Sequence, residues 1–156
     1  MLYLILLVVI VGCDQLLKYW ITTNLALQQV QTLIPNLFSL TYLRNDGAAW
    51  SILQGKQLFF MLLTPIVILV LGYLLLKARR QHRIYALGLT FMIAGALGNF
   101  IDRLRLGYVV DMFQLDFINF PIFNLADSAL TVGVILVFVY LIFFADEKGQ
   151  VCKKKI

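Results

Sequence analysis

Four long apolar stretches dominate this 156-residue sequence and limit what the chain can fold into. They cover about residues 2–22, 58–76, 84–101 and 125–144. A helix needs about 20 apolar residues to cross roughly 30 Å of hydrocarbon, and each stretch is close to that length. The whole chain is 62% hydrophobic and 13% charged, which lies outside the usual range of water-soluble domains. The sequence therefore predicts an all-α membrane protein with four transmembrane helices in a single domain.

Basic residues are distributed unequally among the segments that flank these stretches. The short connection 77–83 and the tail 145–156 hold eight Lys and Arg residues, whereas the long connections 23–57 and 102–124 hold four. Cytoplasmic loops of membrane proteins carry an excess of Lys and Arg. We therefore expect both chain ends and the short connection in the cytoplasm, and both long connections on the outer side.

The first long connection contains a candidate β element. Residues Leu37–Leu43, "LFSLTYL", are rich in β-branched, aromatic and leucine side chains, which favours one or two short strands. Asn45, Asp46 and Gly47 follow, and this combination indicates a turn. We expect a small extracytoplasmic β element here beside the four helices, and a loop in the second long connection.

Residue counts exclude several classes of site. The single histidine, His82, lies in the basic cluster "KARRQHR", which leaves no base for a Ser-His-Asp or Cys-His mechanism and no histidine-based zinc site. Cys13 and Cys152 are too far apart for a zinc motif or a disulfide framework. The net charge of +5 comes from basic residues at the ends of apolar stretches, so nucleic acid is not an expected partner. No metal or cofactor is expected.

Ionisable residues within membrane spans are rare, and they are functional candidates by default. Asp14 and Lys18 are four residues apart on the first stretch and share one helix face. Two interpretations remain open: a self-neutralising pair with Lys18 extended outward to the membrane surface, or a functional role for Asp14. Asn99, Asp102 and Arg103 end the third stretch, where they are expected to pin a loop or to receive a polar ligand.

Small residues recur on one face of the third stretch. Gly88, Gly95 and Gly98 are separated by seven and then three residues, which places them on the same side of a helix. Small residues allow transmembrane helices to approach one another closely. We therefore expect this face to pack against a neighbouring helix.

Two further aspartates are expected near the outer face. Asp111 is flanked by apolar residues in "VVDMF", and burial of such a carboxyl would raise its pKa. Asn124, Asp127 and Ser128 open the fourth stretch, where each residue type can cap a helix. If Asn124 or Ser128 provides the cap, Asp127 is free to pair with Asp111. Two adjacent carboxylates can divide the roles of base and acid, as in aspartic peptidases, but their spacing alone is a weak signal.

Four segments occur in a characteristic order: "CDQLLKYW", "RNDGAAWSI", "GALGNFIDRLRLGYVVDMF" and "FNLADSAL". Together they resemble the lipoprotein signal peptidase (signal peptidase II) family of bacteria, and the resemblance covers essentially the whole chain. It implies that Asp111 and Asp127 form the catalytic pair. Trp50 stands where the family often has Phe, so an aromatic side chain is retained. The resemblance also implies that seven residues bind substrate or support the site: Asp14, Asn45, Gly47, Asn99, Asp102, Arg103 and Asn124.

The resemblance further implies an activity. A membrane aspartic endopeptidase of this kind removes signal peptides from diacylglyceryl-modified prolipoproteins by cutting just before the lipidated cysteine. The implied partners are these precursors and membrane lipid, the implied inhibitor is the cyclic peptide globomycin, and a monomer is expected. The protein would lie in the bacterial cytoplasmic membrane with its site near the extracytoplasmic face, and its first outer loop would cover the substrate.

Two other functions are compatible with ionisable residues near membrane spans. A small proton-coupled transporter or channel could use the aspartates as a proton path. Such a path should continue into the cytoplasmic half of the spans, and every acidic residue in the spans is instead expected toward the outer side. A structural or chaperone-like membrane subunit could use the same residues for helix packing.

Overall fold

The structure is a computed structural model that describes residues 1–47, 53–80 and 82–144. Trp50 lies outside the described residues. The elements in chain order are α1 (Leu2–Asn24), β1 (Val30–Ile34), β2 (Phe38–Asn45), α2 (Gln57–Ala78), α3 (Arg83–Leu106), β3 (Val109–Leu115) and α4 (Leu125–Phe143). All four helices are long and apolar enough to cross a membrane. The prediction of a four-helix membrane protein with a small β element is confirmed.

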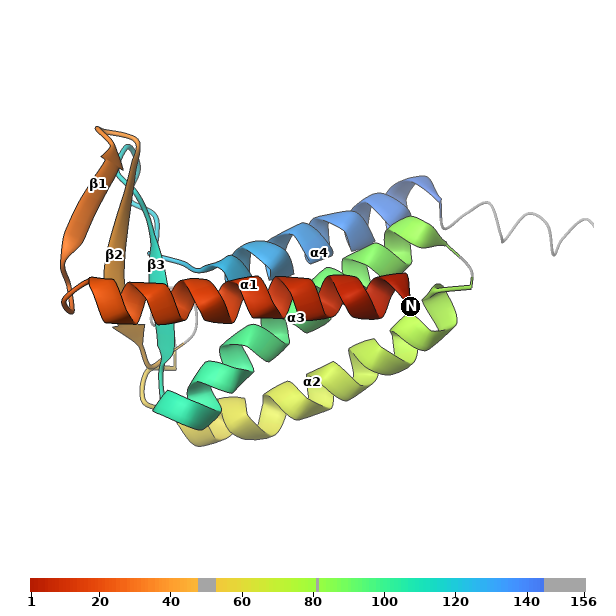
Figure 1. Cartoon of the computed structure of the whole chain (residues 1–156). Helices are drawn as coiled ribbons and strands as arrows, with labels where there is room; N and C mark the ends of the chain where they lie inside the picture. The colour runs from red at the N-terminus through yellow and green to blue at the C-terminus, as the bar shows by residue number, and fades with distance from the viewer. Residues whose placement is uncertain (48–52, 81, 145–156) are drawn as a thin grey trace, which may run out of the picture.

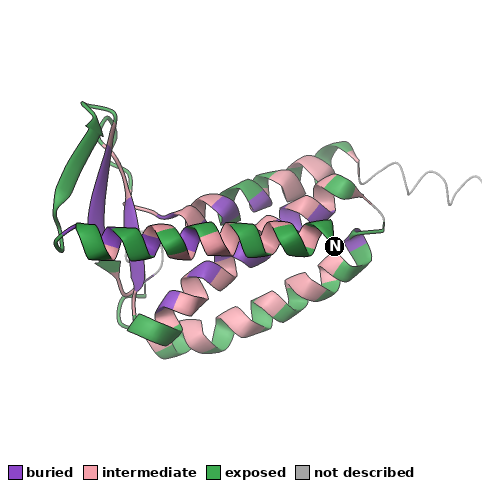
Figure 2. Ribbon diagram, in the orientation of Figure 1, coloured by how far each residue is buried: buried purple, intermediate pink, exposed green. Residues whose placement is uncertain are grey.

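The four helices form a bundle with the sheet across one end, here called the sheet end (Figure 1). The N-terminus and the α2–α3 connection lie at the opposite end (Figure 1). Helix α3 packs against each of the other three helices and has the largest buried share. In α2 only Ala78 is buried, and Figure 2 shows this helix as a mixture of exposed and intermediate residues. Apolar side chains that face outward along a helix of this length fit a hydrocarbon environment.

The sheet is antiparallel with the strand order β1-β2-β3, and its third strand was not predicted. The second long connection was expected to be a loop, but residues 109–115 pair with β2. Val109, Val110 and Met112 are all buried in this strand. Apolar side chains on both faces made this short segment hard to recognise as a strand, because a half-buried strand alternates apolar and polar residues.

A small hydrophobic core joins the sheet to the bundle. Ile21 of α1 and Leu25, which directly follows this helix, pack with Tyr42 of β2 and with Val110 and Met112 of β3. These side chains are almost completely buried, so α1 and both strands are fixed relative to one another. This contact holds β3 in place where Asp111 projects from it.

The end of α3 directs the chain into β3. Gly107 follows the helix with a φ of 78°, in the left-handed region that glycine adopts without a steric penalty. Helix α3 extends to Leu106, so Asp102 and Arg103 belong to its last turns. The chain therefore needs only a few residues to pass from Asp102 to Asp111.

Candidate active site

Asp111 projects from β3 at the sheet end and is 1% exposed. Both of its carboxylate oxygens accept hydrogen bonds from amide side chains. Asn45, at the end of β2, donates to Oδ2 over 2.8 Å, and Asn124 donates to Oδ1 over 2.7 Å. Two donors on opposite sides fix the orientation of the carboxylate without neutralising it. Two of the residues expected to support the site therefore contact Asp111 directly.

Asp127 lies in the first turn of α4 and is also held by two donors. The Asn99 amide donates to its Oδ1 over 2.7 Å, and the backbone N–H of Asn124 donates to its Oδ2 over 3.3 Å. Asn124 is the N-cap, and its side-chain oxygen accepts the backbone N–H of Asp127 over 2.9 Å. The expectation that Asn124 caps the helix is confirmed, although Asp127 is not free of the cap, because its own side chain completes a capping box. Its carboxylate retains the Asn99 contact in addition to the cap.

Asn124 connects the two aspartates. Its amide nitrogen donates to Asp111, while its carbonyl oxygen and its backbone N–H both contact Asp127. The asparagine is itself fully buried. One rigid side chain at a helix start therefore sets the relative position of two carboxylates from β3 and α4.

The electrostatics of Asp111 follow from this arrangement. Burial, and then the nearby charge of Asp127, raise the pKa of Asp111 from its ordinary value of 3.8 to about 7, against the opposing effect of the Asn45 and Asn124 amides. A carboxyl with such a pKa exchanges its proton near neutral pH. A neighbouring pair in this environment can hold one proton between two carboxylates, which suits general acid–base chemistry.

Arg103 borders the same region from the last turns of α3. Its Nη2 donates to the backbone carbonyl of Gly47 over 2.8 Å, and its guanidinium lies 4.6 Å from the ring centroid of Phe60. The backbone N–H of Gly47 in turn donates to Asn45 Oδ1 over 2.9 Å. The predicted turn after β2 is therefore tied to both Arg103 and the Asn45 that contacts Asp111. Among the described residues, the buried Nε of Arg103 has no hydrogen-bond partner.

A second polar cluster lies beside the aspartate pair. Lys18 forms ion pairs with Asp14 over 3.1 Å and with Asp102 over 2.9 Å. Lys18 is 3% exposed, so the expectation that it extends outward to the membrane surface was wrong. Gln15 was not among the predicted site residues, and its amide nitrogen donates to Asp14, Asp102 and the Gly98 carbonyl. A polar amide inside an apolar stretch was the signal that could have identified it.

The single histidine lies away from the aspartate pair. His82 lies at the end of the bundle far from the sheet and stacks against Tyr140 and Phe144. In the described part of the chain, no group of three or more His, Cys, Asp and Glu residues is arranged to hold a metal ion. The described polar groups around the aspartate pair include carboxyl, amide, ammonium and guanidinium groups.

The fold and this site define a multi-pass membrane protein with a pair of amide-anchored carboxylates at one end of its helix bundle, of which Asp111 is buried and Asp127 is partly exposed. The family model described as signal peptidase (SPase) II matches residues 6–143, and the chain belongs to that family. The resemblance inferred from the four motifs is thereby confirmed. This membership does not favour the transporter alternative.

Relatives and solved structures agree with the family. A lipoprotein signal peptidase of Latilactobacillus sakei is 58% identical over 142 residues, covering 91% of this chain and 94% of the relative. One of Enterococcus faecalis is 54% identical over 147 residues, covering 94% and 90% of the respective chains. A bacterial membrane enzyme solved by the in meso method at 2.3 Å superposes with a TM-score of 0.88 at 39% identity, covering 95% of this chain and 90% of its own.

Proposed function

We propose that this protein is an aspartic endopeptidase that removes signal peptides from diacylglyceryl-modified prolipoproteins. It cuts just before the lipidated cysteine, with Asp111 and Asp127 as the catalytic pair. Family membership supports a peptidase, and the lipoprotein signal peptidases among its relatives support the substrate class. The observation that carries the aspartic mechanism is the anchoring of the Asp111 and Asp127 carboxylates by one shared residue, Asn124.

The pair divides the chemistry between its ionised and its protonated member. The ionised carboxylate takes a proton from water as the water oxygen attacks the scissile carbonyl carbon. The protonated carboxyl gives its proton to the carbonyl oxygen, which forms a tetrahedral gem-diol. On collapse, a proton passes to the amide nitrogen, the C–N bond breaks, and the new amine and acid leave.

Neighbouring residues position the reacting groups. Asn45 and Asn99 each hold one carboxylate in a fixed orientation. The Nε of Arg103, which has no hydrogen-bond partner in the described part of the chain, is available to the peptide backbone of the substrate. The turn at Gly47 that Arg103 holds is available in the same way. Groups fixed before substrate arrives lower the entropic cost of reaching the reactive geometry.

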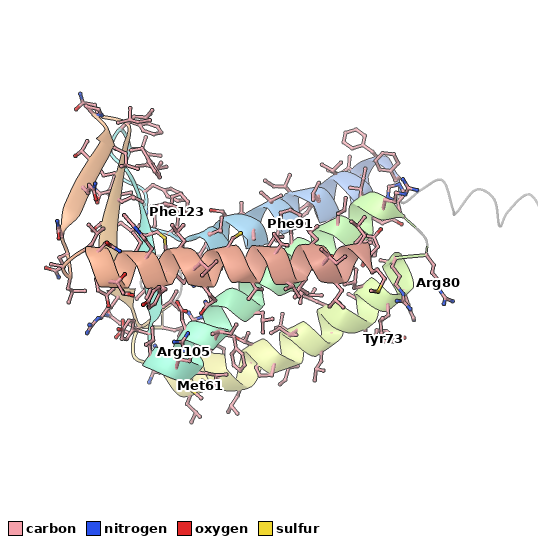
Figure 3. All side chains as sticks on the ribbon, viewed as in Figure 1. Met61, Tyr73, Arg80, Phe91, Arg105 and Phe123 are labelled. Atoms are coloured by element: carbon pink, nitrogen blue, oxygen red, sulfur yellow. The ribbon has the colours of Figure 1, made fainter. Side chains whose placement is uncertain are left out.

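The position of the site suits a lipidated substrate. The basic residues Lys77, Arg79, Arg80 and Arg83 flank the connection at the end away from the sheet, where Figure 3 labels Arg80, and this charge distribution supports a cytoplasmic location for that end. The sheet end then faces the extracytoplasmic side. There, acyl chains can stay in hydrocarbon while the scissile bond reaches water. The protein acts as a monomer, and globomycin inhibits it by occupying the aspartate pair.

A cleavage assay tests this function. Detergent-purified protein is incubated with a diacylglyceryl-modified precursor peptide, and the products are identified by mass spectrometry. We expect a globomycin-sensitive cut just before the lipidated cysteine, loss of that cut in Asp111→Asn, and full activity in the control Asp116→Asn, which alters an exposed residue beyond the end of the same strand. Normal cleavage by folded Asp111→Asn would rule out the proposed mechanism.

A further inference from the structure

A buried triad of charges lies directly beside the aspartate pair. The Lys18 ammonium sits between the carboxylates of Asp14 and Asp102, at 3.1 and 2.9 Å. Asp14 is 1% exposed, and Lys18 and Asp102 are each 3% exposed. The three residues come from α1 and α3, and neither helix carries the candidate catalytic aspartates.

Each carboxylate of the triad also holds the backbone next to one catalytic aspartate. Asp14 Oδ1 accepts the backbone N–H of Ala126 over 2.9 Å, and Ala126 directly precedes Asp127. Asp102 Oδ2 accepts the backbone N–H of Val110 over 3.0 Å, and Val110 directly precedes Asp111. The two contacts are therefore equivalent, one on α4 and one on β3.

The ammonium has a third link to the pair. Lys18 Nζ donates to Asn99 Oδ1 over 3.0 Å, and the Asn99 amide donates to Asp127 over 2.7 Å. An amide whose oxygen is held by a cation must present its NH₂ group to the other side. Lys18 thereby determines which way Asn99 points.

We infer that Lys18 is a positioning residue for both catalytic aspartates, acting through Asp14, Asp102 and Asn99. This inference rests on the proposed function of Asp111 and Asp127. A single ammonium fixes the backbone before each aspartate and the amide that orients one of them. The spacing of the pair therefore depends on α1, which contributes no reacting group.

Stability alone is a poor explanation for this arrangement. Buried ion pairs are costly to desolvate, and apolar residues of similar volume often replace them with no loss of stability. The α3–α4 contact far from the sheet uses glycine packing instead, with Gly88 against Gly133. Positioning of the aspartate pair explains a charged triad at the sheet end, because a displacement of about 1 Å in an active site can reduce the rate roughly 100-fold.

The test must distinguish the positioning of the catalytic aspartates from the loss of stability that an unpaired buried charge causes. Lys18→Met alone leaves two buried carboxylates without a cation and is expected to fold poorly. The double variant Asp14→Asn/Lys18→Met removes one charge of each sign, keeps an oxygen that can accept the Ala126 N–H, and keeps Asp102 for Val110. We expect its melting temperature to fall less than that of Lys18→Met, because only one carboxylate, that of Asp102, is left without a cation. Its kcat should fall roughly 10- to 100-fold with little change in KM, because the lipid and peptide contacts remain.

Lys77→Met is the matched control, because it makes the same side-chain change on α2, where Lys77 lies over the Tyr73 ring. It should keep the unmodified kcat. A double variant with unmodified kcat would overturn the inference. If the double variant does not accumulate, Lys18→Arg provides the test instead. Its larger planar cation keeps the charge but cannot make the same three contacts near 3 Å, so kcat should fall. An unmodified kcat in Lys18→Arg would overturn the inference.

The result for Asp111→Asn, measured beside these variants, keeps the two claims distinguishable. An inactive Asp111→Asn with a fully active Lys18 series removes only the positioning role. An active Asp111→Asn removes the proposed function and, with it, the reason for positioning the pair.

Discussion

Helices α3 and α4 lie against each other along the bundle, but the two halves of their contact are built differently. Far from the sheet, backbone meets backbone: a Cβ added to Gly133 would lie 2.6 Å from the carbonyl oxygen of Gly88. Near the sheet, Gly95 also lies close to the Ala126 backbone, but here the hydrogen bond between Asn99 and Asp127 is added. Close apolar packing is enough to hold two helices together. The polar half therefore points to a role beyond holding the fold together.

The two halves of the contact are therefore expected to respond differently to substitution. Changes in the polar half should reduce activity while the protein remains folded. Changes in the apolar half should reduce stability while the folded fraction keeps its specific activity. The following predictions run from the largest expected effect to the smallest.

Asp127→Asn should have the largest effect on activity. Asparagine retains the shape of the side chain and can still accept the helix-capping N–H of Asn124, but it cannot exchange a proton at neutral pH. Loss of one partner in general acid–base catalysis costs about 10²- to 10⁴-fold in rate. Cleavage assays beside thermal melts should show this loss with little change in melting temperature, and a parallel loss of both would assign Asp127 to the fold instead.

Gly133→Ala should mainly reduce stability. The added methyl group would meet the Gly88 carbonyl at 2.6 Å and the Met92 backbone nitrogen at 2.7 Å, so α3 and α4 must separate. Overpacking of this kind costs about 1–3 kcal/mol. Gly72→Ala on α2 is the matched control, since its Cβ would meet nothing within 4 Å. A melting temperature equal to that of the control would show that this close contact is unimportant.

Asn45→Ala should have a smaller effect on activity. It removes one of the two amide donors to Asp111 but leaves the Asn124 contact. Because the Asn45 hydrogen bond lowers the pKa of Asp111, its loss should move that pKa further upward. We expect normal expression and about a tenfold lower kcat/KM at neutral pH, against unchanged activity in Asn119→Ala on the exposed turn after β3. Full activity in Asn45→Ala would remove this residue from the site.

The helices were predictable because the relevant signal is local. A run of apolar residues is enough to indicate a span, and the recurrence of Gly88, Gly95 and Gly98 indicated the face of close approach. A Cβ on Gly95 would clash with the Ala126 carbonyl oxygen, and one on Gly98 would lie 2.7 Å from Asp14 Oδ2. The expectation that this face packs against a neighbouring helix is confirmed.

The features that were missed depend on partners far away in the sequence. Strand β3 forms because β2 offers it an edge about 70 residues earlier in the chain. Lys18 turns inward because Asp102 and Asn99 approach it from α3, more than 80 residues away. A local pattern predicts that a lysine near a helix end extends to the membrane surface, and only the tertiary structure provides a buried alternative.

The most direct test of the central claim is the pH dependence of kcat/KM for cleavage of the lipidated precursor, which reports the essential groups of the free enzyme. Asp111 has a pKa of about 7, raised by burial and by the charge of Asp127. We expect kcat/KM to change with pH around pH 7, and we expect this change to occur at higher pH in Asn45→Ala. A flat profile from about pH 5 to about pH 9, or a change that occurs at the same pH in Asn45→Ala, would contradict a proton-sharing pair built on Asp111.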